Sequence, residues 1–343
     1  MTLSKIALSL STLVLTSLVS SNSFAAASDK VVVYCSAQNI VCEKAIQGFS
    51  EKYNIKASFI RNSSGSTLAK MEAEKNNPQA DVWYGGPFDT HLQAVELGLI
   101  EPYTSPKQSE VMPQFQKLGD GNSSIVYMGV LGFGVNTERL KKLGINEVPK
   151  CWKDLLDPRL KNEIQLADPQ SSGTAYTAIS TFIQLWGEDK AFDYLKKLHQ
   201  NISQYPKAGT APSRNTARGE TAIGMGFLQN YSFEKENGAP IELIVPCEGT
   251  GYELGGISVI KNARNLENAK LFVDWVMSKE AQELSWQKAQ SHHIPTNINA
   301  EPSPYSLKPS DLNLINYDFN KFGSNDIRSK LIEKWVTDVK LAK

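Results

Sequence analysis

The sequence predicts an α/β protein with two domains, each built on a mixed sheet, that are joined by strands crossing between them. The first observation is length: a chain of 343 residues exceeds the roughly 100 to 200 residues that one hydrophobic core usually serves. The second is a regular alternation of strand-like and helix-like segments, which is typical of sheets covered by helices on both faces. The third is a pair of late strand-like segments that return toward the first domain. With residues 1–27 set aside as a signal peptide, one lobe is expected to comprise 28–127 and 250–300, and the other 128–249 and 301–343.

The first α/β series is expected between residues 31 and 97. Residues 31–35 form a short apolar run, and residues 41–53 repeat apolar side chains at the helical spacing. The alternation continues with strands expected at 55–60 and 80–84 and helices expected at 67–75 and 90–97. Ligands of such sheets bind beyond the carboxyl ends of the strands, so the turns after these strands are candidate binding positions.

A second α/β series follows a glycine-punctuated apolar run at 125–135, which is long enough to cross between domains and is a hinge candidate. Asn136 and Thr137 are expected to cap a short helix that ends at residue 143. Further strands are expected at 164–167 and 221–226, and helices at 172–186, 189–199, 210–218 and 228–236. Strands at 241–246 and 255–260 are then expected to return to the first domain, followed by one amphipathic helix over 267–289.

The first 27 residues are predicted to be a secretory signal peptide. Lys5 precedes an uncharged apolar run, and Ser23, Ala25 and Ala27 are small residues at the spacing that a signal peptidase recognises. The apolar run is shorter than the roughly 20 residues that a membrane-spanning helix needs. We therefore expect a periplasmic chain that begins near residues 26–28.

The charge balance and the cysteines restrict the partners. Lys plus Arg and Asp plus Glu are both 36, so the chain has no general basic field for nucleic acid, and a small molecule is the expected partner. An even number of cysteines in an oxidising compartment predicts disulfides. We expect Cys35 to pair with Cys42 across the turn from a strand to its helix, and Cys151 to pair with Cys247. The cysteines lack the spacing of a zinc cluster, and neither a metal nor a cofactor is expected.

Three turns rich in serine and glycine stand where strands give way to helices, at 36–39, 63–67 and 170–174. Backbone N–H groups and hydroxyls at the positive end of a helix can hold a phosphate or a carboxylate. Each turn taken alone can equally be an ordinary helix cap. Three turns in corresponding places of two domains predict one shared anion-binding cleft. The candidate ligand residues in these turns are Ser36, Asn39, Ser64, Ser66, Ser172, Gly173 and Thr174.

The sequence holds no clear motif of a hydrolase or of a nucleotide-hydrolysing enzyme. Gly-x-Ser-x-Gly, His-Glu-x-x-His and the phosphate loop ending in Gly-Lys-Ser/Thr are all absent. Three acids near the expected cleft, Asp168, Glu248 and Glu253, could orient the hydroxyls of a sugar or act as acid and base. We therefore expect a binding protein, with a secreted phosphatase or other hydrolase as the rival from another class.

Five segments in this order resemble the ferric-ion type of bacterial extracellular solute-binding proteins. They are ADVWYGG at 80–86, DPQSSGT at 168–174, ARGE at 217–220, EGTG at 248–251 and PTN at 295–297. The resemblance covers essentially the whole chain after residue 27. It implies a type II periplasmic binding protein, whose two lobes close on a solute and deliver it to the permease and ATPase subunits of an ABC importer. We expect such a protein to act as a monomer.

The iron site of this family is where the chain departs from the resemblance. Iron binders of the type use a histidine after the first strand, a glutamate after the third and adjacent tyrosines on a later helix. The matching positions are Asn39, Gly86 and Tyr231 with Ser232, and one phenolate with amides does not supply the anionic oxygens that ferric iron prefers. By contrast, the turn at 172–174 matches the place where these proteins hold an accompanying phosphate anion. The resemblance therefore implies that the anion half of the site is kept.

The chain is more similar to the AfuA-like branch, which captures hexose phosphates. In that branch a His-Asp pair and a later glutamate hold the sugar hydroxyls, and here Glu253 matches the glutamate while Gln229 and Asn230 replace the pair. Amide side chains can donate and accept hydrogen bonds toward hydroxyls but carry no charge. The resemblance thus implies a receptor for a phosphorylated organic solute such as a hexose phosphate. A phosphonate resembling aminoethylphosphonate, and ferric iron with a synergistic anion, stay open as alternatives.

Overall fold

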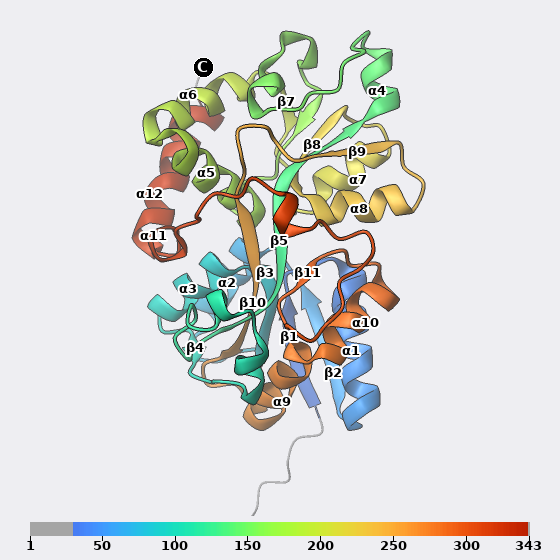
Figure 1. Cartoon of the computed structure of the whole chain (residues 1–343). Helices are drawn as coiled ribbons and strands as arrows, with labels where there is room; N and C mark the ends of the chain where they lie inside the picture. Colours follow the sequence, from blue (N-terminus) through green and yellow to red (C-terminus); the bar gives the residue numbers. More distant parts are fainter. Residues whose placement is uncertain (1–29, 342–343) are drawn as a thin grey trace, which may run out of the picture.

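The computed structural model describes residues 30–341, which form two lobes stacked along one axis (Figure 1). The predicted signal peptide lies outside the described residues. No helix in the described part of the chain is long and apolar enough to cross a membrane. Each lobe contains a sheet with helices on both faces, and long strands run between the lobes. The predicted α/β class, with two mixed-sheet domains joined by crossing strands, is confirmed.

The strands form two sheets that share one long strand. They are β1 (Lys30–Cys35), β2 (Lys56–Arg61), β3 (Val82–Pro87), β4 (Ile100–Glu101), β5 (Ser124–Asn136), β6 (Ile164–Gln165), β7 (Ile202–Gln204), β8 (Ile223–Phe227), β9 (Ile241–Ile244), β10 (Tyr252–Ile260) and β11 (Ile294–Pro295). Their order is β2-β1-β3-β10-β5-β8-β6-β7, with β4 on β10 and with β9 and β11 on β5. β1 is parallel to β2 and β3, whereas β10 is antiparallel to β3 and β5.

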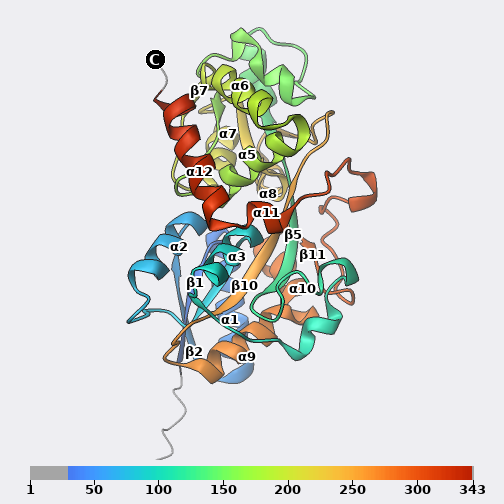
Figure 2. The same ribbon diagram turned by 90° about the vertical axis from the view of Figure 1, so that its left-hand side faces the viewer.

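The helices cover both faces of each sheet (Figures 1 and 2). They are α1 (Asn39–Tyr53), α2 (Ser64–Ala73), α3 (Phe88–Glu96), α4 (Thr137–Lys142), α5 (Gly173–Trp186), α6 (Glu188–His199), α7 (Ala211–Ala217), α8 (Leu228–Glu236), α9 (Leu266–Met277), α10 (Lys279–Ala289), α11 (Phe319–Phe322) and α12 (Asn325–Trp335). In the first lobe α2 and α3 lie opposite α1, α9 and α10, and in the second lobe α5, α6 and α12 lie opposite α7 and α8.

Strand β5 belongs to both lobes. Its first half pairs with β10 in the first sheet, and its second half pairs with β8 and β9 in the second sheet. Every residue of β5 is buried, as the apolar run at 125–135 requires. The prediction that the strand at 241–246 returns to the first domain is wrong, because β9 pairs with β5 in the second sheet and only β10 returns. The residue limits of the two domains stay a prediction.

The single helix predicted over 267–289 is also wrong, because the segment forms two helices, α9 and α10. Ser278 between them has an extended backbone, and its hydroxyl accepts a hydrogen bond from the Ala281 N–H at 3.2 Å. The Asn297 amide donates to the Met277 carbonyl at the end of α9, at 2.9 Å. Serine is a preferred helix N-cap, so the break begins a new helix while the apolar periodicity continues on both sides.

The C-terminal segment beyond β11 connects the two lobes a further time. In the second lobe the ring of Trp335 in α12 lies edge-on to Tyr205, with centroids 5.0 Å apart. Toward the first lobe, the Tyr317 hydroxyl donates to Asp89 in α3 at 3.2 Å. Figure 2 shows α11 at the junction beside α3, with α12 running up the second lobe. No elements were predicted in this part of the sequence, although Ile327, Leu331, Trp335 and Val339 recur at the spacing of a helix.

Each disulfide lies within one lobe. Cys35 at the end of β1 is bonded to Cys42 in α1, and Cys151 is bonded to Cys247 in the second lobe. These are the two pairs expected from the sequence. The first disulfide joins the end of β1 to α1, on either side of the turn at 36–39.

Candidate functional site

A cleft between the two lobes gathers most of the predicted site residues. It has a volume of about 420 Å³ including its open mouth, which is within the usual range for small-molecule sites. The predicted residues that line it are Ser36, Ser64, Gly86, Ser172, Gly173, Thr174, Gln229, Asn230 and Glu253. Turns that are far apart in the sequence therefore meet at one place.

Three predicted residues, Asn39, Ser66 and Tyr231, are not among the residues that line the cleft. Asn39 is exposed as the first residue of α1. Tyr231 is buried, and its hydroxyl lies in the second lobe beside Gly224 of β8, with no hydrogen-bond partner in the described part of the chain. The one phenol that matches an iron ligand of the family therefore does not face this cleft.

Several helices begin at the cleft because the carboxyl ends of parallel strands in both sheets point toward it. Ser172 caps α5 by accepting a hydrogen bond from the Ala175 N–H at 3.4 Å. The first N–H of this helix, that of Gly173, donates to the hydroxyl of Ser64 at the start of α2, at 3.0 Å. In the first turn of α8 lie Gln229 and Asn230. These helix N-termini direct partial positive charge into the cleft, which favours an anion.

Gly86 lets the end of β3 pass close to two of the serine-bearing turns. Its φ is +85°, a conformation that side chains rarely adopt. A Cβ atom at this position would lie 2.9 Å from the Cβ of Ser64 and 3.1 Å from the Cβ of Ser36. The Gly86 N–H donates to the hydroxyl of Tyr127 at 3.0 Å. The absence of a side chain is therefore a requirement of the cleft.

Arg61 is the one Lys or Arg side chain among the described residues that line the cleft. Its Nε donates to the Ala37 carbonyl at 3.1 Å, and its Nη2 donates to the Thr210 hydroxyl of the second lobe at 3.3 Å. Burial and the neighbouring Arg214 lower the pKa of Arg61, but a guanidinium stays protonated at neutral pH. No ion pair with a carboxylate is formed within residues 30–341, so its charge is available to a bound anion.

The opposite part of the cleft is polar but neutral. The Gln229 amide Nε2 donates to Glu253 Oε1 at 2.9 Å, and His293 Nε2 lies 4.0 Å from the same oxygen. Burial raises the pKa of Glu253 to about 8 and lowers the pKa of His293 to about 3. At pH 7 the carboxyl group is therefore protonated and the imidazole is uncharged. The Gln229 Oε1 is buried and has no hydrogen-bond partner among the residues that the structure describes, so a ligand that donates a hydrogen bond would satisfy it.

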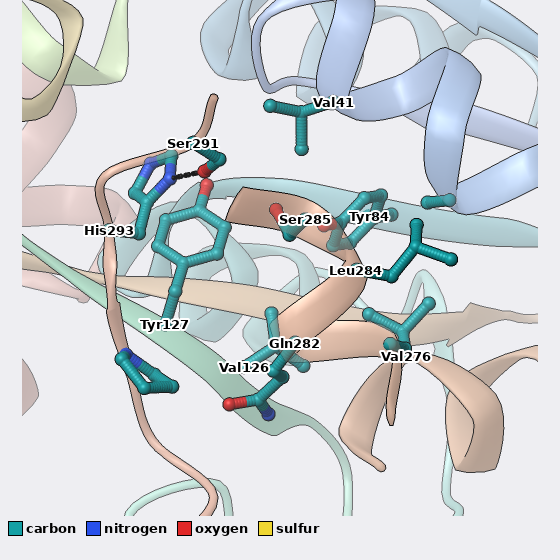
Figure 3. A pocket seen from close by; sticks show the side chains of 13 residues that line it. Val41, Tyr84, Val126, Tyr127, Val276, Gln282, Leu284, Ser285, Ser291 and His293 are labelled. Carbon is teal, nitrogen blue, oxygen red and sulfur yellow. Dashed lines mark hydrogen bonds between the residues drawn. The ribbon is translucent and has the colours of Figure 1, made fainter. Parts of the chain in front are cut away.

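Tyr127 and His293 line both the cleft and a second pocket of the first lobe, which Figure 3 shows. Their ring centroids are 4.0 Å apart, and His293 Nδ1 is hydrogen-bonded to the Ser291 hydroxyl. The second pocket is lined largely by apolar side chains such as Val41 and Leu284. This packing fixes the imidazole at the neutral part of the cleft.

The two lobes touch along the rim of the cleft. The Gln38 amide donates to the Asn230 side-chain oxygen at 2.7 Å, and the Ser63 hydroxyl donates to the Lys207 carbonyl at 3.3 Å. The bonds from Arg61 to Thr210 and from the Gly173 N–H to Ser64 also join the first lobe to the second lobe here. The structure is thus a closed arrangement of the lobes.

The sequence interpretation missed several residues of the cleft. Gln38 lines the cleft, whereas the predicted residue Asn39 does not. Helix α1 begins at Asn39, and the Asn39 side chain is exposed to solvent. Arg61 could have been predicted from the sequence, because it ends a strand directly before the serine-rich turn at 63–67. Tyr127 and His293 could not, because an aromatic residue in a buried strand and a histidine in a loop more often serve packing.

Comparisons with known proteins agree with this geometry. The family described as bacterial extracellular solute-binding protein matches residues 77–322. An uncharacterized protein of Haemophilus influenzae is 62% identical over 346 residues, which cover 100% of both chains. A putative 2-aminoethylphosphonate-binding periplasmic protein of Salmonella typhimurium is 27% identical over 274 residues, covering 76% of this chain and 75% of the relative.

A solved structure is similar over nearly the whole described chain. It is the periplasmic binding protein AfuA from Actinobacillus pleuropneumoniae with exogenous fructose-6-phosphate bound, at 63% identity and a TM-score of 0.90, covering 91% of this chain and 99% of that one. Such an identity over such a length indicates common descent as well as a common fold. The chain belongs to the bacterial extracellular solute-binding proteins, in the AfuA-like branch of the ferric-ion type.

Proposed function

We propose that this protein is the periplasmic substrate-binding component of an ABC importer and captures a phosphorylated organic solute of the sugar phosphate class. Closure of the two lobes would enclose the solute, since contacts made to both lobes favour the closed state. The permease and ATPase of the importer would be its partners, and the protein would meet them as a monomer carried to the periplasm by the segment 1–27.

The observation that carries this proposal is the charge distribution of the cleft. Arg61 and the first turns of α2 and α5 gather positive charge at the serine-bearing turns, while Gln229 and protonated Glu253 are uncharged hydrogen-bonding groups. A sugar phosphate has the complementary form, with a dianion joined to neutral hydroxyls. The bound fructose-6-phosphate of the AfuA structure supports the same class of solute.

The neutral groups also favour a hydroxyl over an ammonium group. Gln229 Oε1 needs a donor, and the protonated Glu253 can donate to an acceptor. A sugar hydroxyl does both at once. An ammonium group would satisfy Gln229 but has no lone pair with which to accept a hydrogen bond from the protonated Glu253.

The test is titration calorimetry of the mature protein with fructose 6-phosphate, glucose 6-phosphate, the two parent sugars, inorganic phosphate and 2-aminoethylphosphonate. We expect at least one hexose phosphate to bind orders of magnitude more tightly than its parent sugar, because several charge-assisted hydrogen bonds of roughly 1.5 to 3 kcal/mol each are lost with the phosphate. Tight binding of an unphosphorylated sugar would overturn the proposal.

A phosphonate is the second candidate solute, favoured by the similarity to the putative 2-aminoethylphosphonate-binding protein. The anion end of the cleft would hold a phosphonate as it holds a phosphate. In the calorimetry series, preference for 2-aminoethylphosphonate over every hexose phosphate would support this candidate. Visible colour from ferric iron that resists citrate would instead favour the iron-binding alternative.

A further inference from the structure

Arg328 in α12 is a buried cation that does not line the cleft. It lies close to the turn at 63–67, which forms part of the proposed anion site. The residue is 5% exposed, and both Nη1 and Nη2 are buried without hydrogen-bond partners among residues 30–341. The guanidinium stacks over the ring of Tyr176 in α5, with 4.6 Å between its central carbon and the ring centroid. A buried cation without partners is costly unless a nearby charge compensates it.

The guanidinium lies directly behind two of the anion-binding turns. A Cβ atom built on Gly65, in the first turn of α2, would lie 3.0 Å from Arg328 Nη2 and 3.0 Å from the Ser171 backbone. Gly65 follows Ser64, and Ser171 precedes Ser172, so the turns of the two lobes meet in front of this one side chain. Arg328 thus stands behind the place where the N-termini of α2 and α5 face each other.

Arg328 has one carboxylate beside it but forms no direct ion pair in the described chain. Asp89 is the carboxylate whose charge acts on it, and the phenols of Tyr176 and Tyr317 are the other titratable groups beside it. Asp89 forms no ion pair with Arg328 in the described chain; its Oδ2 accepts from Tyr317 at 3.2 Å and its Oδ1 is unpaired. A negative charge in the cleft would therefore add compensation that the protein itself provides only in part.

We propose that Arg328 is a positioning residue of the anion site, whose buried positive charge strengthens the binding of a doubly charged phosphate group from behind the turns at 63–67 and 170–174. The inference rests on the proposed anion-binding function of the cleft. Since Arg328 belongs to the second lobe and Gly65 to the first lobe, the charge acts fully only when the lobes are closed.

The test compares ligands that differ in charge alone. Fructose 6-phosphate is a dianion at pH 8, whereas fructose 6-sulfate has nearly the same shape and carries one charge. We expect Arg328→Met to weaken the phosphate ester roughly tenfold and the sulfate ester by only about threefold, because the interaction energy scales with the ligand charge. Arg328→Lys, which keeps the cation, is expected to preserve the ratio of the two affinities, and Arg328→Gln is expected to lower it.

Arg218→Met is the matched control, because Arg218 is an exposed arginine of the same lobe that pairs with Glu220; it should change neither affinity. Equal losses for both esters in Arg328→Met and Arg328→Gln, or no loss at all, would overturn the inference, since a purely structural role does not distinguish ligand charge. If Arg328→Met does not fold, the comparison of Arg328→Lys with Arg328→Gln decides.

The same series with methyl phosphate and methyl sulfate separates this inference from the proposed function. A wild-type protein that binds methyl phosphate but no hexose phosphate contradicts the sugar phosphate proposal, and Arg328 is still judged on the methyl esters. A wild-type protein that binds no phosphate ester contradicts both.

Discussion

The backbone N–H of Gly173 donates a hydrogen bond to the hydroxyl of Ser64 across the boundary between the two lobes, with 3.0 Å between the atoms. The first N–H groups of a helix have no partner within the helix. In this arrangement one lobe supplies that partner to the helix of the other. A phosphate oxygen can accept a hydrogen bond from this N–H as the hydroxyl oxygen does, so the pair marks where we expect the anion to bind.

The first prediction concerns the cap of α5. Ser172→Ala removes a hydroxyl that both caps the helix and lines the cleft. We expect it to weaken all phosphorylated ligands by a similar factor, of roughly 10- to 150-fold, since a lost hydrogen bond to a charged group costs about 1.5 to 3 kcal/mol. Calorimetry with two hexose phosphates measures the effect. A change in the preference between the two sugars would contradict it.

The second prediction concerns Arg61. Arg61→Gln should weaken a hexose phosphate by roughly 10- to 100-fold, the value of one hydrogen bond to a charged group. Arg214→Gln is the matched control, because Arg214 is exposed and donates to the same Thr210 hydroxyl without lining the cleft. Unchanged affinity in Arg61→Gln would show that the guanidinium does not meet the anion.

The third prediction is a pH dependence that originates from Glu253. Its pKa of about 8 means that the carboxyl group loses its proton as the pH rises through that value. The resulting charge would lie in the same cleft as the phosphate dianion, so affinity for a hexose phosphate should fall between pH 7 and pH 9.5. Glu253→Gln should remove this fall, because a neutral amide does not titrate. An equal fall in both proteins would place its origin elsewhere.

The same group affects stability with a defined sign. The folded state holds a proton on Glu253 that the unfolded chain releases near the ordinary glutamate pKa of about 4.3. The free energy of unfolding should therefore decrease, through this group, as the pH rises from about 4.3 to about 8. Denaturant titrations of the wild type and of Glu253→Gln should show a smaller decrease in the variant over this range.

The fourth prediction separates backbone strain from steric exclusion. Gly86 and Gly98 both have positive φ, but a Cβ at residue 86 would meet Ser64 and Ser36, whereas nothing lies within 4 Å of a Cβ at residue 98. Gly98→Ala should lower stability by about 1 kcal/mol, the usual cost of this conformation for alanine. Gly86→Ala should cost more and should also abolish binding. Retained affinity in Gly86→Ala would contradict the close approach.

The fifth prediction concerns the bond between Cys151 and Cys247, whose sequence separation is 96 residues. Replacing both cysteines by serine should lower the free energy of unfolding by about 2 to 5 kcal/mol, because the unfolded chain is no longer restrained by a long loop. Thermal unfolding measures this loss. Affinity for the solute should stay unchanged, since neither cysteine lines the cleft.

The sequence predicted the elements that carry strong local patterns. Strand β5, the cap at Ser172 and the turns at 36–39 and 63–67 follow from apolar runs and from serine or glycine at helix starts, so they were placed within a few residues. The break at Ser278 was missed because both helices keep their apolar faces on one core. The sheet assignment of β9 was missed because pairing partners are a property of the whole fold.

Some residues of the candidate site could likewise be predicted from local patterns, and others could not. Ser64 and Gly173 could be expected at the cleft because their turns end strands that must point toward it. Tyr231 could not be placed, because residues on one helix turn differ in direction by about 100° each and the rotation of α8 depends on its packing. The approach of Arg328 to Gly65 brings together opposite ends of the chain, which no local pattern encodes.

The position of the two disulfides within separate lobes has a consequence for how the protein works in its compartment. Neither bond spans the cleft, so oxidation strengthens each half of the molecule while leaving the halves free to part. Reduction of the two disulfides would therefore lower the stability of each lobe, but we expect it to leave the opening of the lobes and the release of a bound solute unchanged.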